Sequence, residues 1–373
     1  MASVKREEAI FADLPLNQIL FGDCLDILPK LPSHSIDLIF ADPPYNLQLQ
    51  KELWRPNQTP VVGVDDEWDR FANFEDYDDF TTRWLSECRR VLKTTGTLWV
   101  IGSYHNIYRV GKIMMDLGFW ILNDVIWHKT NPMPNFRGAR FQNATEILLW
   151  AKRSREARGY TFQYQAMKNL NEGKQMQNVW HLPLCTGAER MKIDGKKAHS
   201  TQKPEALLYR VILASSKPGD VVLDPFLGTG TTAVVAKRLG RHFIGIERDP
   251  RYIGLAQERL KNTPFCGVDE RELLITPSKR AAPRVAFGQL VEAGYLKVGT
   301  VLYSRDRRIV AYVKADSLLR WDSKEGSIHQ IAALAEGKPA CNGWEYWYYE
   351  DEDGQLISID VLRARYRAEN GLE

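Results

Sequence analysis

The sequence has little that would place the protein in a membrane or outside the cell. Its first residues include Lys5, Arg6, Glu7 and Glu8 before only a few apolar positions, so no signal-peptide core is evident, and no apolar run is long enough to span a bilayer. The five cysteines are scattered, without a C-x-x-C motif or a cysteine–histidine cluster. We therefore expect a cytoplasmic protein with free thiols, no disulfide framework and no metal site.

Internal repeats, low-complexity tracts and a large net charge are also lacking. The net charge is only +3 over 373 residues, but it is unevenly distributed. Residues 128–217 hold 16 lysines and arginines against 6 acidic residues, a balance of +10, whereas residues 284–373 have a balance of −2. Because lysine and arginine neutralise phosphates, the middle segment indicates a nucleic-acid partner. A solvated basic surface is the alternative.

One short stretch, Asp42-Pro43-Pro44-Tyr45, follows an apolar run at 35–41 that is typical of a buried strand. Two prolines fix the backbone, so the Asp42 carboxylate and the Pro43 carbonyl are held rigidly at the end of this strand. Two such acceptors can each take one N–H of an exocyclic amine, which frees its lone pair for attack. Tyr45 would stack on the base. The alternative is a surface turn with a tyrosine as core filler.

Strand and helix patterns alternate along most of the chain. We expect strands within 17–24, 35–41, 97–101, 120–127, 145–151, 220–224 and 241–247, and helices within 77–92, 107–117, 204–216, 231–239 and 251–260. This alternation predicts a doubly wound α/β domain with a mostly parallel sheet. The long turn-rich stretch at 46–69 interrupts it next to the presumed reacting atom, as a lid would.

A glycine-rich turn, Pro225-Phe226-Leu227-Gly228-Thr229-Gly230-Thr231, lies between a predicted strand ending at Asp224 and a predicted helix. Glycine lets the backbone approach a ligand closely, and Glu247, at the end of the next strand, could accept hydrogen bonds from both hydroxyls of a ribose. These features predict a nucleotide-like cofactor. Spacing alone would also fit a dinucleotide such as NAD.

Taken together, these motifs resemble those of the β group of DNA amino-methyltransferases, in which the catalytic half precedes the cofactor half. Asp42-Pro43-Pro44-Tyr45 resembles the target-amine motif, and Asp224 to Gly230 resembles the S-adenosylmethionine motif. Two shorter stretches, His199-Ser200-Thr201-Gln202-Lys203-Pro204 and Gly22-Asp23-Cys24, resemble family segments near the methionine and adenine ends of the cofactor. The resemblance covers about residues 1–260.

The resemblance implies the roles of individual residues. The implied catalytic residues are Asp42, Pro43, Pro44 and Tyr45. The implied S-adenosylmethionine-binding residues are Asp23, Cys24, His199, Thr201, Gln202, Lys203, Asp224, Pro225, Phe226, Gly228, Gly230, Thr231 and Glu247. Aspartate rather than serine before the two prolines favours adenine N6 over cytosine N4 as the target.

The loop from Asn131 to Gly138 and the C-terminal extension are similar to those of cell-cycle-regulated adenine methyltransferases of the CcrM type, which modify GANTC. This similarity implies a double-stranded DNA substrate in the bacterial nucleoid, a link to DNA replication and a homodimer in some members. The expected DNA-binding residues are Asn131, Arg137, Arg140, Ser327, His329, Asn342 and Trp344. Ser327 as a helix cap and Trp344 as a core residue are the alternatives.

We expect a methyltransferase domain at 1–262, with a recognition insertion at about 131–198 and the cofactor half at 199–262, then a linker at 263–283 and a small α+β accessory domain at 284–373. In the accessory domain we expect strands at 301–303, 309–313 and 344–349, with a helix at 327–335. The predicted activity is site-specific methylation of DNA adenine N6 by base flipping. A cytosine-N4 or RNA amino-methyltransferase, or a catalytically silent DNA-binding protein, are the alternatives.

Overall fold

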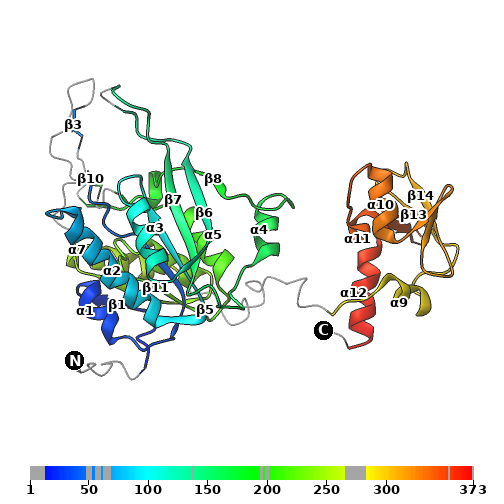
Figure 1. The fold of residues 1–373 in the computed structure, drawn as a ribbon, viewed down its shortest axis with the longest axis horizontal. Helices are drawn as coiled ribbons and strands as arrows, with labels where there is room; N and C mark the ends of the chain where they lie inside the picture. Colours follow the sequence, from blue (N-terminus) through cyan, green and yellow to red (C-terminus); the bar gives the residue numbers. More distant parts are fainter. Residues whose placement is uncertain are drawn as a thin grey trace. The chain divides into compact units, whose positions relative to one another are not determined.

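A computed structural model of the protein describes residues 13–47, 53–54, 60–61, 69–135, 138–193, 196–197, 201–264, 283–351 and 353–371, with only the backbone at 53–54, 60–61, 192–193 and 196–197. Two expected residues, His199 and Arg137, lie outside the described residues. Most of the expected lid at 46–69 and of the expected linker at 263–283 also lies outside them. Contacts divide the chain into two units, Met1–Pro277 and Ser278–Glu373 (Figure 1).

The first unit is built on an eight-stranded sheet with the strand order β1-β12-β11-β2-β5-β7-β6-β8. Its strands are β1 (Gln18–Phe21), β2 (Ile36–Ala41), β5 (Leu92–Gly102), β6 (Trp120–Lys129), β7 (Thr145–Lys152), β8 (Val179–Leu182), β11 (Val221–Asp224) and β12 (His242–Glu247). Two short pairs, β3 (Leu53–Trp54) with β4 (Pro60–Val61) and β9 (Lys192–Ile193) with β10 (Lys196–Lys197), lie outside it.

The helices of this unit are α1 (Cys24–Ile27), α2 (Phe74–Val91), α3 (Ile107–Asp116), α4 (Tyr164–Leu170), α5 (Glu205–Ser215), α6 (Thr231–Arg238) and α7 (Pro250–Lys261), with 3-10 turns at Leu28–Lys30 and Gly187–Glu189. Local sequence explains where they begin. The Asn73 side chain accepts a hydrogen bond from Asp76 N at the start of α2, and Asp249 caps α7 directly before Pro250. Acidic residues begin α2 and Arg89 and Arg90 end it, as the helix dipole favours.

Strand direction decides where the polar ends of the strands meet. β1, β12, β11, β2 and β5 pair in parallel, so their carboxyl ends share one edge of the sheet. β7 runs antiparallel to both β5 and β6, and β8 is parallel to β6. The prediction of a doubly wound, mostly parallel sheet is therefore confirmed.

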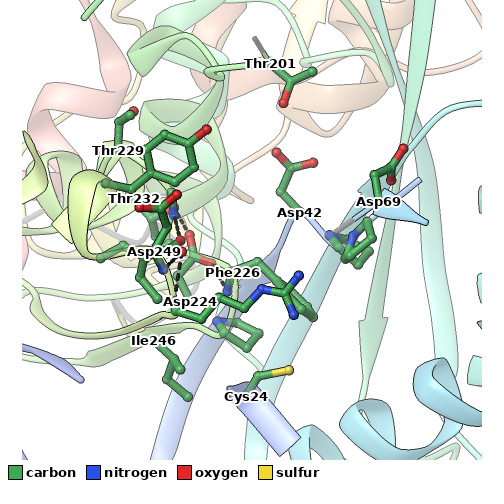
Figure 2. A pocket seen from close by; sticks show the side chains of 18 of the residues that line it. Cys24, Asp42, Asp69, Thr201, Asp224, Phe226, Thr229, Thr232, Ile246 and Asp249 are labelled. Carbon is green, nitrogen blue, oxygen red and sulfur yellow. Dashed lines mark hydrogen bonds between the residues drawn. The ribbon is translucent and has the colours of Figure 1, made fainter. Parts of the chain in front are cut away.

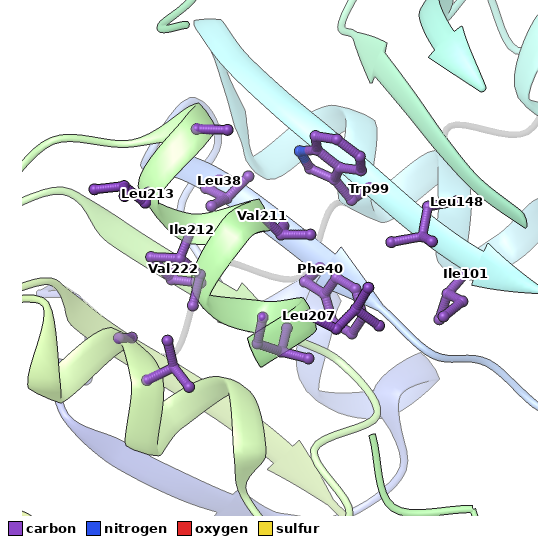
Figure 3. Packing of buried hydrophobic residues seen from close by; sticks show 14 of the residues in the cluster. Leu38, Phe40, Trp99, Ile101, Leu148, Leu207, Val211, Ile212, Leu213 and Val222 are labelled. Carbon is purple, nitrogen blue, oxygen red and sulfur yellow. The ribbon is translucent and has the colours of Figure 1, made fainter. Parts of the chain in front are cut away.

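Alternate residues of the central strand β2 serve two separate hydrophobic cores. Leu38 and Phe40 pack on one face with Trp99, Val211 and Ile212, where α5 crosses the sheet (Figure 3). Ile39 and Ala41 point to the other face, in the core that contains residues of α1, α2 and α3. Because both faces are covered, the strand has no polar side for solvent, which explains its almost continuous apolar sequence.

Part of the expected recognition insertion at about 131–198 belongs to the main sheet and its hydrophobic core, which the prediction of an insertion did not include. β8 extends the main sheet, and Trp180, Ala166 and Met167 are buried in the same core as Leu38. The sequence around β8 alternates exposed and buried positions over only four residues. That run is too short for periodicity to reveal a strand.

The second unit is a small α+β domain, as predicted. Its six-stranded antiparallel sheet has the order β16-β15-β14-β13-β17-β18, from β13 (Val301–Tyr303), β14 (Val310–Val313), β15 (Leu319–Trp321), β16 (Lys324–Gly326), β17 (Tyr348–Glu350) and β18 (Leu356–Ser358). Its helices are α9 (Phe287–Glu292), α10 (Ile328–Glu336), α11 (Gly343–Tyr346) and α12 (Ile359–Glu369), and they help to enclose a core of their own.

The predicted strand at 344–349 is wrong in its first half. Residues 343–346 form the helix α11, and the strand β17 begins only at Tyr348. Trp344 and Trp347 are 7% and 0% exposed, and their spacing of three places both on one side of a helical turn. The Trp347 indole donates to the Ile328 carbonyl at 2.9 Å, which locks this arrangement.

Candidate active site

A cavity of about 1100 Å³ lies at the carboxyl edge of the sheet (Figure 2). The segments that follow β1, β2, β11 and β12 line it, together with residues 69–71 and 201–203. Because these strands are parallel, the fold brings to one place polar residues as far apart in the sequence as Asp23 and Arg251. The cavity is thus a product of topology rather than of one local motif.

Most of the expected site residues line this cavity. They are Asp42, Pro43, Pro44 and Tyr45, and with them Asp23, Cys24, Thr201, Gln202, Lys203, Asp224, Pro225, Phe226, Gly228, Thr231 and Glu247. Gly230 belongs to the same turn but faces α7, and His199 lies outside the described residues.

The rigid turn after β2 is held by two residues that the sequence analysis did not assign to the site. The Asp69 carboxylate accepts hydrogen bonds from the backbone N–H groups of Tyr45, Asn46 and Leu47 at 2.6, 2.8 and 2.9 Å. The Tyr77 hydroxyl donates to the Pro44 carbonyl at 2.9 Å. An acidic residue at the end of the turn-rich stretch was the only signal for Asp69. Because both sets of contacts fix the backbone of the turn, the Asp42 and Tyr45 side chains start from a fixed backbone position.

Asp42 and Tyr45 lie among charged groups at the edge of the cavity. Burial raises the pKa of the Asp42 carboxyl, while the nearby ammonium of Lys203 acts in the opposite direction. Burial also raises the pKa of Tyr45, whose hydroxyl donates to Glu146 Oε2 at 3.0 Å. Glu146, on β7, was missed because a lone glutamate at the start of a strand carries no motif.

The glycine turn after β11 has an unusual backbone. Gly228 and Gly230 have φ values of 54° and 83°, in the left-handed region that favours glycine. Asp224 organises the turn from below, since its two oxygens accept hydrogen bonds from Phe226 N at 2.9 Å and Thr232 Oγ1 at 2.5 Å. Burial raises the pKa of Asp224 to about 7 despite these two bonds.

The carboxylate of Glu247 is fixed by backbone donors. Oε2 accepts from Gly228 N at 2.7 Å, and Oε1 accepts from Arg248 N and Asp249 N at 2.9 and 2.8 Å. Burial raises its pKa, against the effect of these bonds. Oε2 has a second lone pair, so the group can still accept a hydrogen bond from a ligand hydroxyl.

Two further segments complete the cavity. Asp23 caps α1 through Leu25 N at 2.9 Å and lies 3.5 Å from Arg248, across the end of β12. Gln202 is buried and braces the 189–191 segment, because its amide accepts from Met191 N and donates to the Glu189 carbonyl. These contacts shape the walls, whereas Cys24 contributes a buried thiol whose pKa is raised by burial.

Arg259, on α7, ties the glycine turn to α5. Its guanidinium donates to the Thr229 carbonyl at 2.8 Å and to Thr231 Oγ1 at 3.1 Å, and it pairs with Glu205 at 2.8 Å. Arg238 pairs with the same Glu205 at 2.7 Å but from a more exposed position. Sequence analysis assigned no role to Arg259, since a charged residue late in a helix is common.

The expected DNA-binding residues are spread over both units. Asn131 and Arg140 are exposed at the two ends of one loop; Asn131 Oδ1 accepts from Leu184 N at 2.7 Å, and the Arg140 guanidinium lies 5.8 Å from the centre of the Tyr104 ring. Arg137, between them, is outside the described residues. Asn131 therefore anchors the loop, and Arg140 is displayed on the surface.

In the second unit, all four expected residues have structural contacts. Ser327 forms a capping box with Gln330, and Asn342 caps α11. Trp344 is only 7% exposed, with Phe287 and the Arg363 guanidinium against its ring, so its face is not open for stacking in this conformation. His329 accepts a hydrogen bond from Gly343 N at 3.0 Å while remaining exposed.

Two kinds of feature are absent from the described part of the chain, a metal-binding cluster and a membrane span. Within the described ranges, no group of three or more histidine, cysteine, aspartate or glutamate residues is arranged to hold a metal ion. No helix in the part of the chain that the structure describes is long and apolar enough to cross a membrane.

A doubly wound sheet with a glycine turn, a backbone-held carboxylate and the acidic turn after β2 at one edge fits the class of S-adenosylmethionine-dependent methyltransferases. Family comparison agrees: residues 36–258 match the model of the N6/N4 type described as DNA methylase, and residues 268–372 match the one described as Restriction Enzyme Adenine Methylase Associated. The chain belongs to this family of DNA methyltransferases and uses S-adenosylmethionine.

Individual relatives support the same assignment. The chain is 51% identical to Type II methyltransferase M.HinfI of Haemophilus influenzae, over 94% of this chain and 97% of that protein. It is 46% identical to Type II methyltransferase M2.LlaDCHI of Lactococcus lactis subsp. cremoris, over 67% and 91%. Among solved structures, PvuII DNA methyltransferase (cytosine-N4-specific) is 21% identical, with a TM-score of 0.51 over 69% and 90% of the two chains, which is a similarity of fold.

The residues present fit S-adenosylmethionine. Gly228 lines the cavity with a left-handed φ, so a ligand can approach its backbone closely, and Glu247 Oε2 keeps an acceptor site suited to a ribose hydroxyl. Asp23 and Cys24 lie at the part of the cavity expected to receive the adenine ring. The cavity also reaches Asp42, so a ligand bound there and the catalytic turn share one space.

Replacing Gly230 by alanine should weaken both the fold and cofactor binding. A Cβ at this position would lie 2.7 Å from the Ala256 Cβ, and the φ of 83° is unfavourable for alanine. We expect a loss of about 1–2 kcal/mol for the backbone and about 1–3 kcal/mol for the contact. Calorimetry and thermal unfolding measure both effects. As a control, Gly254→Ala on α7 meets open space and should not be destabilising; equal behaviour of the two variants would contradict this account.

The role of Arg259 predicts a second pair of variants. Arg259→Met removes the donors to Thr229 and Thr231, so we expect S-adenosylmethionine to bind about tenfold more weakly, equivalent to ~1.4 kcal/mol. Arg238→Met also removes a partner of Glu205 but makes no recorded contact with the turn, and its affinity should stay within about twofold. Isothermal titration measures both constants. Equal weakening in the two variants would show that Glu205, not the turn, is responsible.

Proposed function

We propose that the protein methylates N6 of adenine at a specific site in double-stranded DNA. The observation that carries the proposal is the position of Asp42, directly after β2. The neighbouring strand β11 leads into the glycine turn, and both turns line the same cavity. The aspartate in Asp42-Pro43-Pro44-Tyr45 and the Restriction Enzyme Adenine Methylase Associated match at residues 268–372 both support adenine as the target.

The bound S-adenosylmethionine supplies an electrophilic methyl group. Asp42 would accept one N–H of the adenine amine and the Pro43 carbonyl the other, so that the nitrogen lone pair becomes available. Tyr45, held by its backbone bonds to Asp69, would stack on the base. The base must leave the duplex to reach this position, because N6 is paired within it. Once the nitrogen has gained a fourth bond, its proton becomes acidic, and the Asp42 carboxylate can accept it.

The proposed recognition site is GANTC, in chromosomal DNA of the bacterial nucleoid. The similarity of the Asn131–Gly138 loop and of the C-terminal extension to enzymes of the CcrM type supports this site and a link to replication and the cell cycle. We also propose a division of labour in which residues 1–262 catalyse transfer and residues 284–373 help to hold DNA.

Product analysis tests the activity directly. The protein is incubated with methyl-labelled S-adenosylmethionine and a duplex containing one GANTC site, and the DNA is digested to nucleosides. We expect label in N6-methyldeoxyadenosine, and none in a matched duplex whose target A·T pair is replaced by G·C. Label in N4-methylcytosine, or label in an RNA of the same sequence offered in a parallel reaction, would support the nearest alternatives, and no transfer at all would support a silent DNA-binding protein.

Asp42→Ala should abolish turnover without unfolding the protein. Its side chain is 19% exposed at the end of a strand, and Lys203 keeps Glu146 beside it, so the variant should lose some stability without unfolding. The loss of one acceptor for the amine should slow transfer at least about a hundredfold, as for the removal of one preorganised catalytic hydrogen bond. Asp26→Ala, at an exposed position of α1, serves as the control. Single-turnover rates and cofactor affinity are measured for both. Transfer by Asp42→Ala within tenfold of the unmodified protein would contradict the mechanism.

The contribution of the middle basic segment is smaller than its charge suggests. Lys129, Lys152 and Lys203 are buried at 7–8% exposure, so they are not available to phosphates. Lys152, for example, donates to the carbonyls of Arg155 and Ala157 inside the protein. Exposed basic residues of this segment include Arg140, Arg155, Arg158 and Lys174, and these remain candidates for phosphate contacts.

A truncation after Ala282 tests the proposed role of the second unit. Because the two units have separate hydrophobic cores, we expect the 1–282 fragment to fold and to bind S-adenosylmethionine, but to lose most of its DNA affinity. Anisotropy titrations with the GANTC duplex, at several salt concentrations, measure this loss. A fragment that methylates the same site with comparable efficiency would show that the second unit is not needed for DNA binding.

A further inference from the structure

The side chain of Lys203 lies on the catalytic turn. The resemblance places this residue near the methionine end of the cofactor, but its ammonium is 2.8 Å from Asp42 Oδ2 and its side chain is only 7% exposed. It also lies 5.1 Å from the centre of the Tyr45 ring. The residue comes from the 201–204 segment that precedes α5, so two distant parts of the sequence meet in this ion pair.

The ion pair belongs to a longer buried chain of charges. Lys203 Nζ is 3.7 Å from Glu146 Oε2, and Lys129 Nζ is 2.8 Å from Glu146 Oε1. The Tyr45 hydroxyl donates to the same Glu146. The order Asp42–Lys203–Glu146–Lys129 alternates in sign and sums to zero charge. Removing one member would leave a neighbour buried without full compensation, which is costly in a protein interior.

The remaining charges around Asp42 make its ionisation depend on this cation. The titratable groups that face it are Lys203 from the segment before α5, Glu146 from β7, Tyr45 from its own turn and Asp224 from β11. Burial raises the pKa of Asp42, and the negative charge of Glu146 raises it further, whereas Lys203 lowers it. Burial would lower the pKa of Lys203 itself, but the two carboxylates keep it above its usual value.

We propose that Lys203 is a positioning residue for methyl transfer, which keeps Asp42 ionised and fixes its Oδ2 atom. Glu146, held in turn by Lys129, keeps the ammonium in place. The inference rests on the proposed function, because it concerns the acceptor for the target amine. It differs from a role in cofactor binding, since Lys203 acts here through Asp42.

The test is the pH dependence of single-turnover transfer, with S-adenosylmethionine and duplex at saturation. An ionised Asp42 is the active form, so activity falls as the pH drops through its pKa. Lys203→Met removes the cation that lowers this pKa, and the acid limb should move to higher pH by roughly one to three units. Lys203→Arg keeps the positive charge, so its acid limb should lie within about half a pH unit of that of the unmodified protein. The cofactor dissociation constant should stay within about threefold in both variants.

Glu146→Gln gives a second measurement with the opposite sign. Its amide oxygen can still accept from Tyr45 and from Lys203, so the ammonium stays beside Asp42, but the variant removes a negative charge that raises the pKa of Asp42. The acid limb should therefore move to lower pH or stay in place. This variant keeps the proposal falsifiable if Lys203→Met does not fold, because a shift of Glu146→Gln to higher pH would overturn it.

Lys93→Met is the matched control. Lys93 pairs with Asp37 at 2.8 Å at the opposite end of the same strand β2, and its loss should leave the pH profile unchanged. An unmoved acid limb in Lys203→Met overturns the proposal. If the cofactor affinity of that variant is also more than tenfold weaker, Lys203 is a cofactor ligand instead. If the unmodified protein does not methylate adenine, the proposed function fails instead, which separates the two results.

Discussion

The parallel pairing of β11 with β2 is the constraint on which the site depends. Val222 and Leu223 pair with Leu38 and Ile39, so the two strands end together. Their last residues lead into the two turns that carry the chemistry, one rich in proline and the other in glycine. A connection that reversed either strand would send its turn to the opposite edge. The helices on both faces hold this pairing by burying nearly every side chain of the two strands.

Four of the carboxylates that line the cavity at this edge are stabilised by different means. Asp23 caps a helix, Asp224 accepts from a hydroxyl and a backbone N–H, and Glu247 accepts from three backbone N–H groups. Asp42 instead is paired with a buried lysine. Neutral donors hold a carboxylate in one orientation and lower its pKa, and a cation adds a Coulombic attraction that favours the charged form further. That difference suits an acceptor that must remain ionised beside a substrate.

The sheet and its main helices could be predicted because each strand is a run of apolar residues closed by a turn, and each helix repeats apolar residues at helical spacing. β8 could not be predicted, because four residues are too few to show a period. The pattern at α11 predicts a strand, because aromatic residues are common in strands, although they also occur in helices. The motifs indicated Asp42 and Gly228, and both line the cavity. Sequence analysis did not assign Asp69, Glu146 or Arg259 to the site, because their contacts are made with distant segments and a lone charged residue has no sequence pattern.

Charge counting illustrates the same limit. The balance of +10 in the middle segment suggested a phosphate-binding surface, yet Lys129 and Lys203 neutralise carboxylates inside the protein and Lys152 binds backbone carbonyls. A buried lysine adds to the net charge of a segment but contributes little to its surface potential when a carboxylate lies beside it. The field at the DNA-facing surface must therefore come from the exposed arginines and lysines. The buried lysines meet separate requirements on the same stretch of sequence: Lys129 and Lys203 pair with carboxylates near the turn after β2, and Lys152 supports the local backbone.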